Sequence, residues 1–123
     1  MGYLPDPVVG YFGDGSKWGL SIEYSVTSPD NETGLRLKLA ADQLDPTFLL
    51  TYCDNYWPMD VARMRDMAAS VDVPAVVTVY ANRDGYTRSN MLVDDAGYVT
   101  AYDPARTTQG LNGVEIGYAM LDH

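Results

Sequence analysis

The hydrophobic pattern in the middle of the chain predicts a strand, a loop and a helix, in that order. Residues 48–51 are apolar or β-favouring and run into the polar segment Cys53-Asp54-Asn55. Pro58 suits the first position of a helix. The apolar residues after it recur at helical spacing: Val61, Met64, Ala68 and Val71. We therefore predict a buried strand at 48–51 and an amphipathic helix from Pro58 to about Ser70.

The hydrophobic periodicity also predicts a second strand after residues 48–70 and a second helix before them. Residues 73–81 form a near-continuous apolar, β-branched run, which is typical of a strand buried on both faces. Two strands joined by a helix of this length are expected to form a right-handed parallel crossover. Residues 33–44 predict an amphipathic helix with one apolar face, made of Leu37, Ala40, Ala41 and Leu44.

The remaining patterns predict shorter elements. Residues 20–26 alternate between apolar and polar, which indicates a strand with one solvated face. Residues 89–93 and 98–102 predict a hairpin around the tight turn at 94–97. A last strand is expected at 113–121. The two prolines and two glycines of residues 1–10 favour a connector over a strand.

Composition narrows the protein class and its partners. The chain has 123 residues, of which 46% are hydrophobic and 20% charged, as in a single globular domain. The net charge of −9, with only eight scattered Lys and Arg residues, argues against nucleic acid or an anionic membrane as partner. No long apolar stretch and no signal-peptide pattern occur, so we expect a cytoplasmic protein.

Candidate chemistry centres on Asp54. A single cysteine, Cys53, and a lone histidine at the extreme terminus, His123, exclude a zinc site and leave oxygen-ligated Mg²⁺ as the metal that the composition supports. Asp54 follows a predicted strand at the position where open α/β sheets bind ligands. It is therefore a candidate ligand for a metal or phosphate. The alternative is that Asp54 or Asn55 only caps the following helix.

A glycine-rich loop, residues 11–19, offers a second candidate site. Its three glycines and Lys17 could bring backbone amides close to a phosphate. Alternatively the loop is a turn before a strand, with Trp18 packed beneath it. Arg36 lies near the start of the predicted helix, where its positive charge interacts unfavourably with the helix dipole and slightly lowers the stability of the helix. A bound anion would reverse this effect.

Three segments, taken together, resemble the sugar-1-phosphate nucleotidyltransferases. Residues 11–19, with Ile22 and Tyr24, are similar to the family's F-G-D-G-S-x-x-G-x-x-I-x-Y segment. Residues 33–38 (Thr-Gly-Leu-Arg-Leu-Lys) are similar to its T-G-G-R-L-K turn, and residues 48–54 to its F-x-x-x-Y-G-D segment. These enzymes join a nucleoside triphosphate to a sugar 1-phosphate and release pyrophosphate.

The resemblance implies a fold and a set of site residues. The fold is α/β and Rossmann-like, the nucleotide-diphospho-sugar transferase fold, with a mixed, mainly parallel sheet and flanking helices. We expect one partial domain over residues 1–123, because the family's first glycine-rich loop has no counterpart here. Asp54 would be catalytic and hold Mg²⁺. The substrate-binding residues would be Thr33, Gly34, Arg36, Asn55, Asn112, Glu115 and Gly117.

The chain departs from the family pattern at several positions. Cys53 replaces the usual glycine before the aspartate, and Ser89 stands where a glycine often meets the sugar. Tyr102-Asp103-Pro104 stands where E-K-P is expected, so the sugar-contacting glutamate and phosphate-contacting lysine are not matched. Whether this chain is by itself an enzyme is therefore open.

Two function classes follow from these observations. The first is nucleotidyl transfer from a nucleoside triphosphate to a sugar 1-phosphate, as part of a larger enzyme. The second is a non-catalytic α/β module, or remnant, that binds a phosphorylated sugar or a protein partner. In either class the family's first, central strand has no counterpart in this sequence. Another copy of the chain could supply that strand, which would make the protein a homo-oligomer. Neither the base nor the sugar can be assigned from the sequence.

Overall fold

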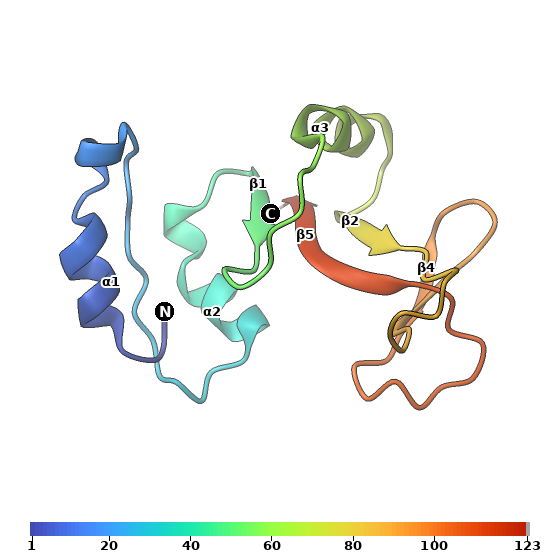
Figure 1. The fold of residues 1–123 in the computed structure, drawn as a ribbon. Helices are drawn as coiled ribbons and strands as arrows, with labels where there is room; N and C mark the ends of the chain where they lie inside the picture. The colour runs from blue at the N-terminus through green and yellow to red at the C-terminus, as the bar shows by residue number, and fades with distance from the viewer. Residues whose placement is uncertain (123) are drawn as a thin grey trace. The chain divides into compact units, whose positions relative to one another are not determined.

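The computed structural model describes residues 1–122 (Figure 1), and the chain divides into two compact units. The first unit is Met1–Asp45 and the second is Pro46–His123. Each has its own secondary structure and hydrogen bonds, so each is described by itself. In the part of the chain that is described, no helix is long and apolar enough to cross a membrane.

The first unit begins with a helix where the sequence predicted a connector. Helix α1 spans Pro5–Phe12, with a proline in its first turn and no buried residue. The prediction for residues 1–10 was wrong because proline is tolerated in the first helical turn, where an N–H group has no partner in any case. A short 3₁₀ helix, η1, follows at Ser16–Trp18.

The strand predicted at 20–26 does not form. The segment is extended but pairs with no strand among the described residues. Isolated bonds hold it instead: Ile22 N–H donates to the carbonyl of Asp14 (2.9 Å) and the Tyr24 hydroxyl donates to that of Gly13 (2.6 Å). Alternation of side chains defines an extended backbone with two faces, but a strand also needs a neighbour to pair with.

The helix predicted at 33–44 is confirmed in its first part only. Helix α2 spans Thr33–Leu39, and the 3₁₀ helix η2 spans Ala41–Gln43. Ala40, with φ −99° and ψ 5°, separates them. The apolar face continues across the break because a 3₁₀ turn changes the spacing of residues only slightly.

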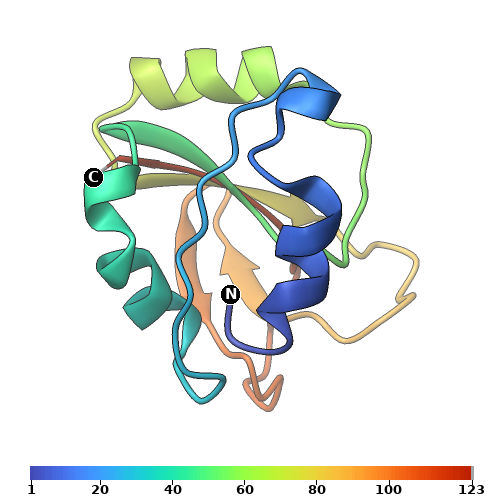
Figure 2. The same ribbon diagram turned by 90° about the vertical axis from the view of Figure 1, so that its left-hand side faces the viewer.

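The second unit contains a three-stranded sheet that is antiparallel throughout its pairing. Its strands are β1 (Thr47–Thr51), β2 (Ala75–Tyr80) and β5 (Val114–Asp122), in the order β1-β5-β2. Helix α3, Val61–Ser70, lies on one side of this sheet, as Figure 2 shows. The prediction of a mainly parallel, Rossmann-like sheet was wrong, because β5 runs antiparallel to both of its neighbours.

The error concerns the partners of the strands rather than their positions. β1 and β2 run in the same direction, as predicted, but they share no hydrogen bonds because β5 lies between them. Hydrophobic periodicity indicates which residues are extended and which face they bury, but not the neighbour of each strand. β2 was also expected to be buried on both faces, and all of its residues are instead half-buried.

A separate hairpin pairs β3 (Met91–Val93) with β4 (Val99–Tyr102), which confirms the prediction for this segment. The carboxylate of Asp94 accepts hydrogen bonds from the backbone N–H groups of Ala96 (3.0 Å) and Tyr98 (2.8 Å), and so fixes the turn. Gly97, at φ 89°, takes the left-handed conformation that the turn requires.

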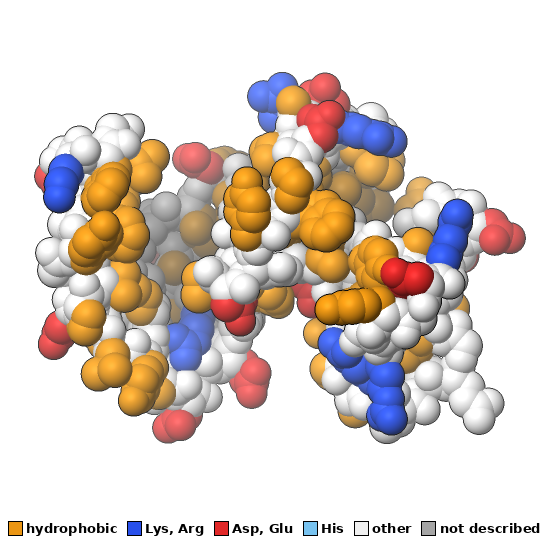
Figure 3. Space-filling model, in the orientation of Figure 1, with side chains coloured by type: hydrophobic (Ala, Val, Ile, Leu, Met, Phe, Trp, Pro, Cys, Tyr) orange, Lys and Arg blue, Asp and Glu red, His pale blue; other side chains and the backbone are white. Residues whose placement is uncertain are grey.

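The core of the second unit gathers around β5. The buried hydrophobic side chains of the chain are Met64, Met91, Val114, Tyr118 and Met120, and the last three belong to β5. Many large apolar side chains stay exposed in each unit, and Figure 3 shows them as hydrophobic surface. Among the described residues, none has a side chain that is completely buried.

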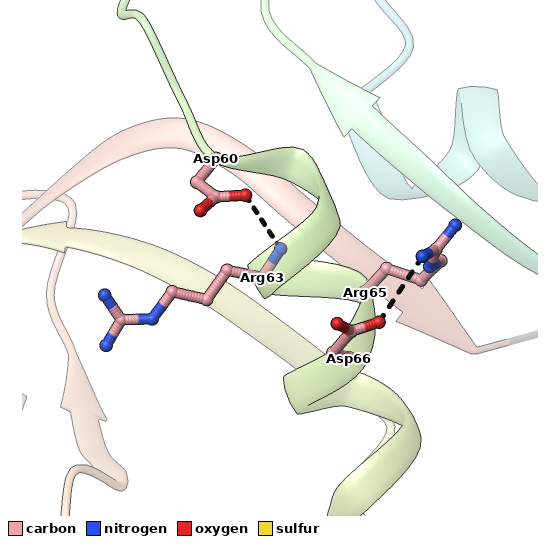
Figure 4. Close-up of polar contacts among 4 residues, drawn as sticks. All are labelled: Asp60, Arg63, Arg65 and Asp66. Carbon is pink, nitrogen blue, oxygen red and sulfur yellow. Dashed lines mark hydrogen bonds and ion pairs between the residues drawn. The ribbon is translucent and has the colours of Figure 1, made fainter.

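Helix α3 begins at Val61, and Asp60 is its N-cap. The Asp60 carboxylate accepts a hydrogen bond from the backbone N–H of Arg63 at 2.9 Å (Figure 4). The helix was predicted to start at Pro58, and it starts at Val61. The alternative that Asp54 or Asn55 caps this helix is wrong, because Asp60 is the cap. A nearby ion pair, Arg65 with Asp66 at 3.4 Å, is exposed to solvent.

Replacing Asp60 by alanine should lower the free energy of unfolding of the protein by about 1 kcal/mol, because the first turn of α3 loses its capping acceptor. Urea unfolding followed by circular dichroism measures the change. Asp66→Ala, which removes the same charge from an exposed pair, is the matched control and should change stability by less than about 0.5 kcal/mol. Equal losses in the two variants would rule out the cap as the cause.

Candidate functional site

The loop that follows β1, residues 52–60, is hydrogen-bonded to β5. Tyr52 donates its backbone N–H to the carbonyl of Gly117 at 3.1 Å. Asn55 donates its side-chain amide to the carbonyl of Ile116. These two bonds hold the loop on either side of Asp54, so its position depends on β5 rather than on β1 alone.

The phenol of Tyr118 provides a second attachment for the same loop. Its hydroxyl donates to the carbonyl of Asn55 (3.0 Å) and accepts from the backbone N–H of Trp57 (2.8 Å). The Tyr118 ring is buried, and a buried phenol is stable when its hydroxyl has partners of this kind. The ring therefore joins the core of the unit to the loop that carries the candidate residues.

Gly117 allows the loop to approach β5 closely. Its φ of 78° lies in the left-handed region that favours glycine. A Cβ atom at this position would lie 2.7 Å from Cδ2 of Tyr52 and 3.3 Å from Nδ2 of Asn55. The sequence predicted Gly117 as a residue beside the sugar, and the structure gives it a contact role under the loop.

Asp54 lies in a turn between the two attached residues of this loop. Its side chain is exposed and, among residues 1–122, accepts no hydrogen bond from the protein. Both carboxylate oxygens are therefore available to a ligand. The loop is held while the carboxylate is free, which is the arrangement that a binding residue needs.

Glu115 is the acidic residue whose charge acts on Tyr52, at the base of the loop. Burial raises the pKa of the Tyr52 phenol, and the charges of Glu115 and Tyr102 raise it further. This pKa shift means that the carboxylate of Glu115 acts on the base of the loop.

Asn90, which the sequence analysis did not identify, positions Glu115. Asn90 is buried, and its side-chain oxygen accepts a hydrogen bond from the backbone N–H of Glu115 at 2.9 Å. Its own backbone N–H donates to the carbonyl of Gly113 (2.9 Å), and its carbonyl accepts from Asp103 (2.8 Å). An asparagine next to the apolar residues of a predicted strand was the available signal, because a buried amide must find partners.

The side chain of Asn112 is hydrogen-bonded to the backbone of Val93. Its amide nitrogen donates to the carbonyl of Val93 (2.8 Å), and its amide oxygen accepts from the N–H of Val93 (2.9 Å). The side chain thus extends the hairpin by one further pair of bonds. The sequence placed Asn112 beside the sugar, and here it fastens β3 to the segment before β5.

The candidates Thr33, Gly34 and Arg36 belong to the first unit. Thr33 and Gly34 are exposed at the start of α2, and a Cβ on Gly34 would meet nothing within 4 Å. Arg36 binds the preceding loop: Nε donates to the carbonyl of Asn31 (2.7 Å), and Nη2 to those of Ser28 (3.2 Å) and Pro29 (3.0 Å). Arg36 therefore has a structural role in its own unit.

The glycine-rich loop at 11–19 is closed by its own side chains. The Asp14 carboxylate accepts from the hydroxyl (2.7 Å) and the N–H (3.0 Å) of Ser16, and these bonds lower the pKa of Asp14. A Cβ on Gly15 would lie 2.6 Å from Cγ1 of Ile22. Trp18 stacks on Tyr11, with ring centroids 5.6 Å apart, and does not lie under a strand. The loop is thus built mainly by internal contacts.

The loop after β4 replaces the expected E-K-P segment with a different structure. The carboxylate of Asp103 accepts from the N–H groups of Ala105 (2.9 Å), Thr107 (2.8 Å) and Thr108 (2.8 Å). The hydroxyls of Thr107 (3.1 Å) and Thr108 (2.8 Å) donate to it as well. These bonds, with those from Thr108 the strongest, hold the pKa of Asp103 far below its ordinary value. Asp103 organises its own loop.

Metal binding would rest on few groups. Within residues 1–122 there is no cluster of three histidine, cysteine or acidic side chains. His123, which the sequence excluded as a zinc anchor, lies outside the described residues. Mg²⁺ needs only one or two carboxylates when substrate phosphates and water complete its octahedral shell. The free carboxylate of Asp54 fits that requirement.

Comparison with known proteins adds no relative to this description. No protein-family model matches the chain, and no curated protein matches it at a significant level. The function of the chain is therefore inferred from its own residues and their geometry.

Replacing Gly117 by alanine should lower the free energy of unfolding by about 2–4 kcal/mol, because the left-handed backbone and the contact with Tyr52 both disfavour a Cβ. Gly110→Ala is the matched control, since Gly110 has a similar φ of 83° and a Cβ there would meet nothing within 4 Å. We expect about 1–2 kcal/mol for the control. Urea unfolding of both variants isolates the cost of the contact.

Replacing Asp103 by asparagine should reduce the dependence of stability on acidic pH. A carboxyl whose pKa is lowered by folding stabilises the protein above its unfolded pKa of about 4 and loses that effect as pH falls towards the folded pKa. The wild type should therefore be more stable than Asp103→Asn at pH 7, and the difference should shrink below about pH 4. Urea unfolding across this range measures it, with Asp95→Asn as control. A difference that is constant with pH would contradict the role of Asp103.

Proposed function

We propose that the chain takes part in nucleotidyl transfer from a nucleoside triphosphate to a sugar 1-phosphate, giving a nucleoside diphosphate sugar and pyrophosphate. The observation that carries the proposal is the free carboxylate of Asp54 on a loop that β5 holds on both sides. The resemblance of residues 48–54 to the metal-binding segment of these enzymes supports the same role. A cytoplasmic location belongs to this proposal.

Asp54 would be the protein ligand of Mg²⁺ in this proposal. The other positions around the ion would be taken by water and by phosphate oxygens of the substrates. When bound, the ion offsets the negative charge that develops on the phosphates during transfer. The loop fixes the carboxylate before the substrate arrives, so the protein does not have to order it at the moment of reaction.

The reaction itself is an in-line displacement. An oxygen of the sugar phosphate attacks the α-phosphorus of the nucleoside triphosphate, the bond from that phosphorus to the bridging oxygen breaks, and pyrophosphate leaves. No covalent link to the protein is needed, so acceleration comes from positioning and charge. In this scheme Glu115 accepts hydrogen bonds from sugar hydroxyls, and Asn55 and Gly117 hold Asp54 in place.

The other residues implied by the resemblance contribute unequally to the proposal. Thr33 and Gly34 are exposed and stay candidates for contact with the base or sugar. Arg36 and Asn112 already donate hydrogen bonds to backbone carbonyls, so a ligand at either residue would compete with those bonds. We therefore assign substrate contact to Glu115 and the loop rather than to Arg36 or Asn112.

A second candidate function is binding of a phosphorylated sugar without chemistry. It is favoured by the small number of free polar groups. Asp54 is a single carboxylate outside any three-residue cluster in the described chain, and Asp103 is engaged within its own loop. A module of this kind would bind ligand and release no pyrophosphate.

Asp54→Asn separates these functions. Pyrophosphate release is measured with Mg²⁺ and a panel of nucleoside triphosphates and sugar 1-phosphates. If the wild type turns over a pair, Asp54→Asn should reduce the rate by at least about 10²-fold. Asp95→Asn, which removes an exposed carboxylate from a hairpin turn, is the matched control and should keep the wild-type rate.

The binding assay uses the same panel and measures the thermal midpoint of each protein. Full turnover by Asp54→Asn would remove Asp54 from the mechanism. A midpoint that rises with a sugar 1-phosphate, without pyrophosphate from any pair, would establish the non-catalytic alternative. No turnover and no midpoint shift with any member of the panel would contradict both functions.

A further inference from the structure

The outer edge of β1 carries unpaired backbone groups. β1 pairs with β5 on one side, and no strand of residues 1–122 pairs with its other side. The N–H of Tyr52 points to β5, where it donates to Gly117. Because these groups alternate along an antiparallel strand, the N–H and C=O groups of Thr47, Leu49 and Thr51 point to the outer edge.

Within the second unit, this edge lacks two of the features that usually prevent edge-to-edge pairing, a charged side chain and a bulge. Natural sheets protect their edges with charged side chains, bulges or a covering element. β1 has no charged residue, and its register with β5 is unbroken from Thr47 to Thr51. The other outer strand, β2, has an irregularity between Val77 and Val79, where its register with β5 shifts. Of the two outer strands of this sheet, β1 is thus the one whose backbone is regular enough to pair.

The sequence of β1 is complementary to itself in the antiparallel direction. It reads Thr47-Phe48-Leu49-Leu50-Thr51, which is nearly the same from either end. An antiparallel pair of two such strands, centred on Leu49, sets Thr47 opposite Thr51 and Phe48 opposite Leu50. Threonine pairs across strands are favourable, and Phe48 opposite Leu50 brings apolar side chains together.

The backbone fits the same register. Leu49 would face Leu49 of the second copy, and Thr47 would face Thr51, so every outward residue would meet another outward residue. Each of these pairs can then exchange both of its N–H···O bonds. A shift by one residue would bring outward groups against residues whose N–H groups already point to β5. The backbone therefore excludes a shift by one residue, and the pairing of threonine with threonine favours the register centred on Leu49 over a shift by two.

We propose that a second copy of this chain pairs with β1 along this edge, in a two-fold symmetric dimer with a continuous sheet. Such a pairing is isologous, since the same strand serves both copies. Helix α3 packs on β2 and β5, and a groove of about 570 Å³ lies between α3 and β1, lined by apolar residues together with Arg65, Asp72 and Asp122. The groove is lined in part by Phe48, Val61 and Ala69.

Charge modulates this association without preventing it. The net charge of −9 on each chain opposes dimer formation. Extending the register outward sets Asp45 opposite Cys53 of the second copy, so no carboxylate faces another carboxylate directly. The repulsion is therefore long-range and screened by salt. The dimer should be stronger at high ionic strength than at low ionic strength.

Sedimentation equilibrium of the full chain tests the dimer. The expected mass is twice 13.5 kDa at high protein concentration, with a dimer fraction that rises with salt. Thr51→Pro removes an outward N–H group while leaving the bonds to β5, and should give a monomer with an unchanged circular dichroism spectrum. Thr51→Ala keeps the N–H group and should remain a dimer. A wild-type mass of 13.5 kDa at all concentrations and salt levels would overturn the proposal.

A disulfide cross-link tests the register and does not depend on how Thr51→Pro folds. In a Cys53→Ser background, Leu49→Cys sets two thiols on the symmetry axis, with Cα atoms about 5.5 Å apart, which a disulfide can bridge. Leu50→Cys in the same background sets the two Cα atoms about 8 Å apart, too far for a bridge. Oxidation should give a covalent dimer for Leu49→Cys only. Equal cross-linking of both variants, or none of Leu49→Cys, would overturn the proposal.

Discussion

The hydrogen bonding of β5 to both of its neighbours is the constraint on which the second unit depends. β1 and β2 have no bond to one another, so each reaches the rest of the unit through β5. The same strand supplies most of the buried core, and its backbone holds the loop that carries Asp54. The fold and the candidate site are therefore not separable: whatever loosens β5 also frees the loop.

Much of the secondary structure could be predicted from the sequence, because it depends on local periodicity. β1, β2, α3 and the β3–β4 hairpin all lie where apolar spacing and turn residues indicated them. The sheet topology could not be predicted in this way. A pattern of apolar positions specifies a buried face, and the same pattern serves a parallel or an antiparallel neighbour. The extended segment at 20–26 failed as a strand for the related reason that nothing pairs with it.

Less of the candidate site than of the secondary structure could be predicted from the sequence. Asp54 could be picked out as a candidate because it follows a strand directly, whereas the close approach of Gly117 to Asn55 became visible only in the structure. The side chains that assemble the site, Tyr118 and Asn90, were missed, since their partners are far away in the sequence. Arg36 shows the opposite error. Its guanidinium has the chemistry of a ligand-binding group, but backbone carbonyls satisfy the same donors.

The bond between Asn55 and Ile116 spans 61 residues, and so does the bond between Trp57 and Tyr118. During synthesis on the ribosome, β1 and its loop emerge well before β5, and they have no sheet partner until β5 arrives. The apolar strand and the Asp54 turn are thus exposed to the cell in the nascent chain. The site can therefore assemble only once β5 has been synthesised.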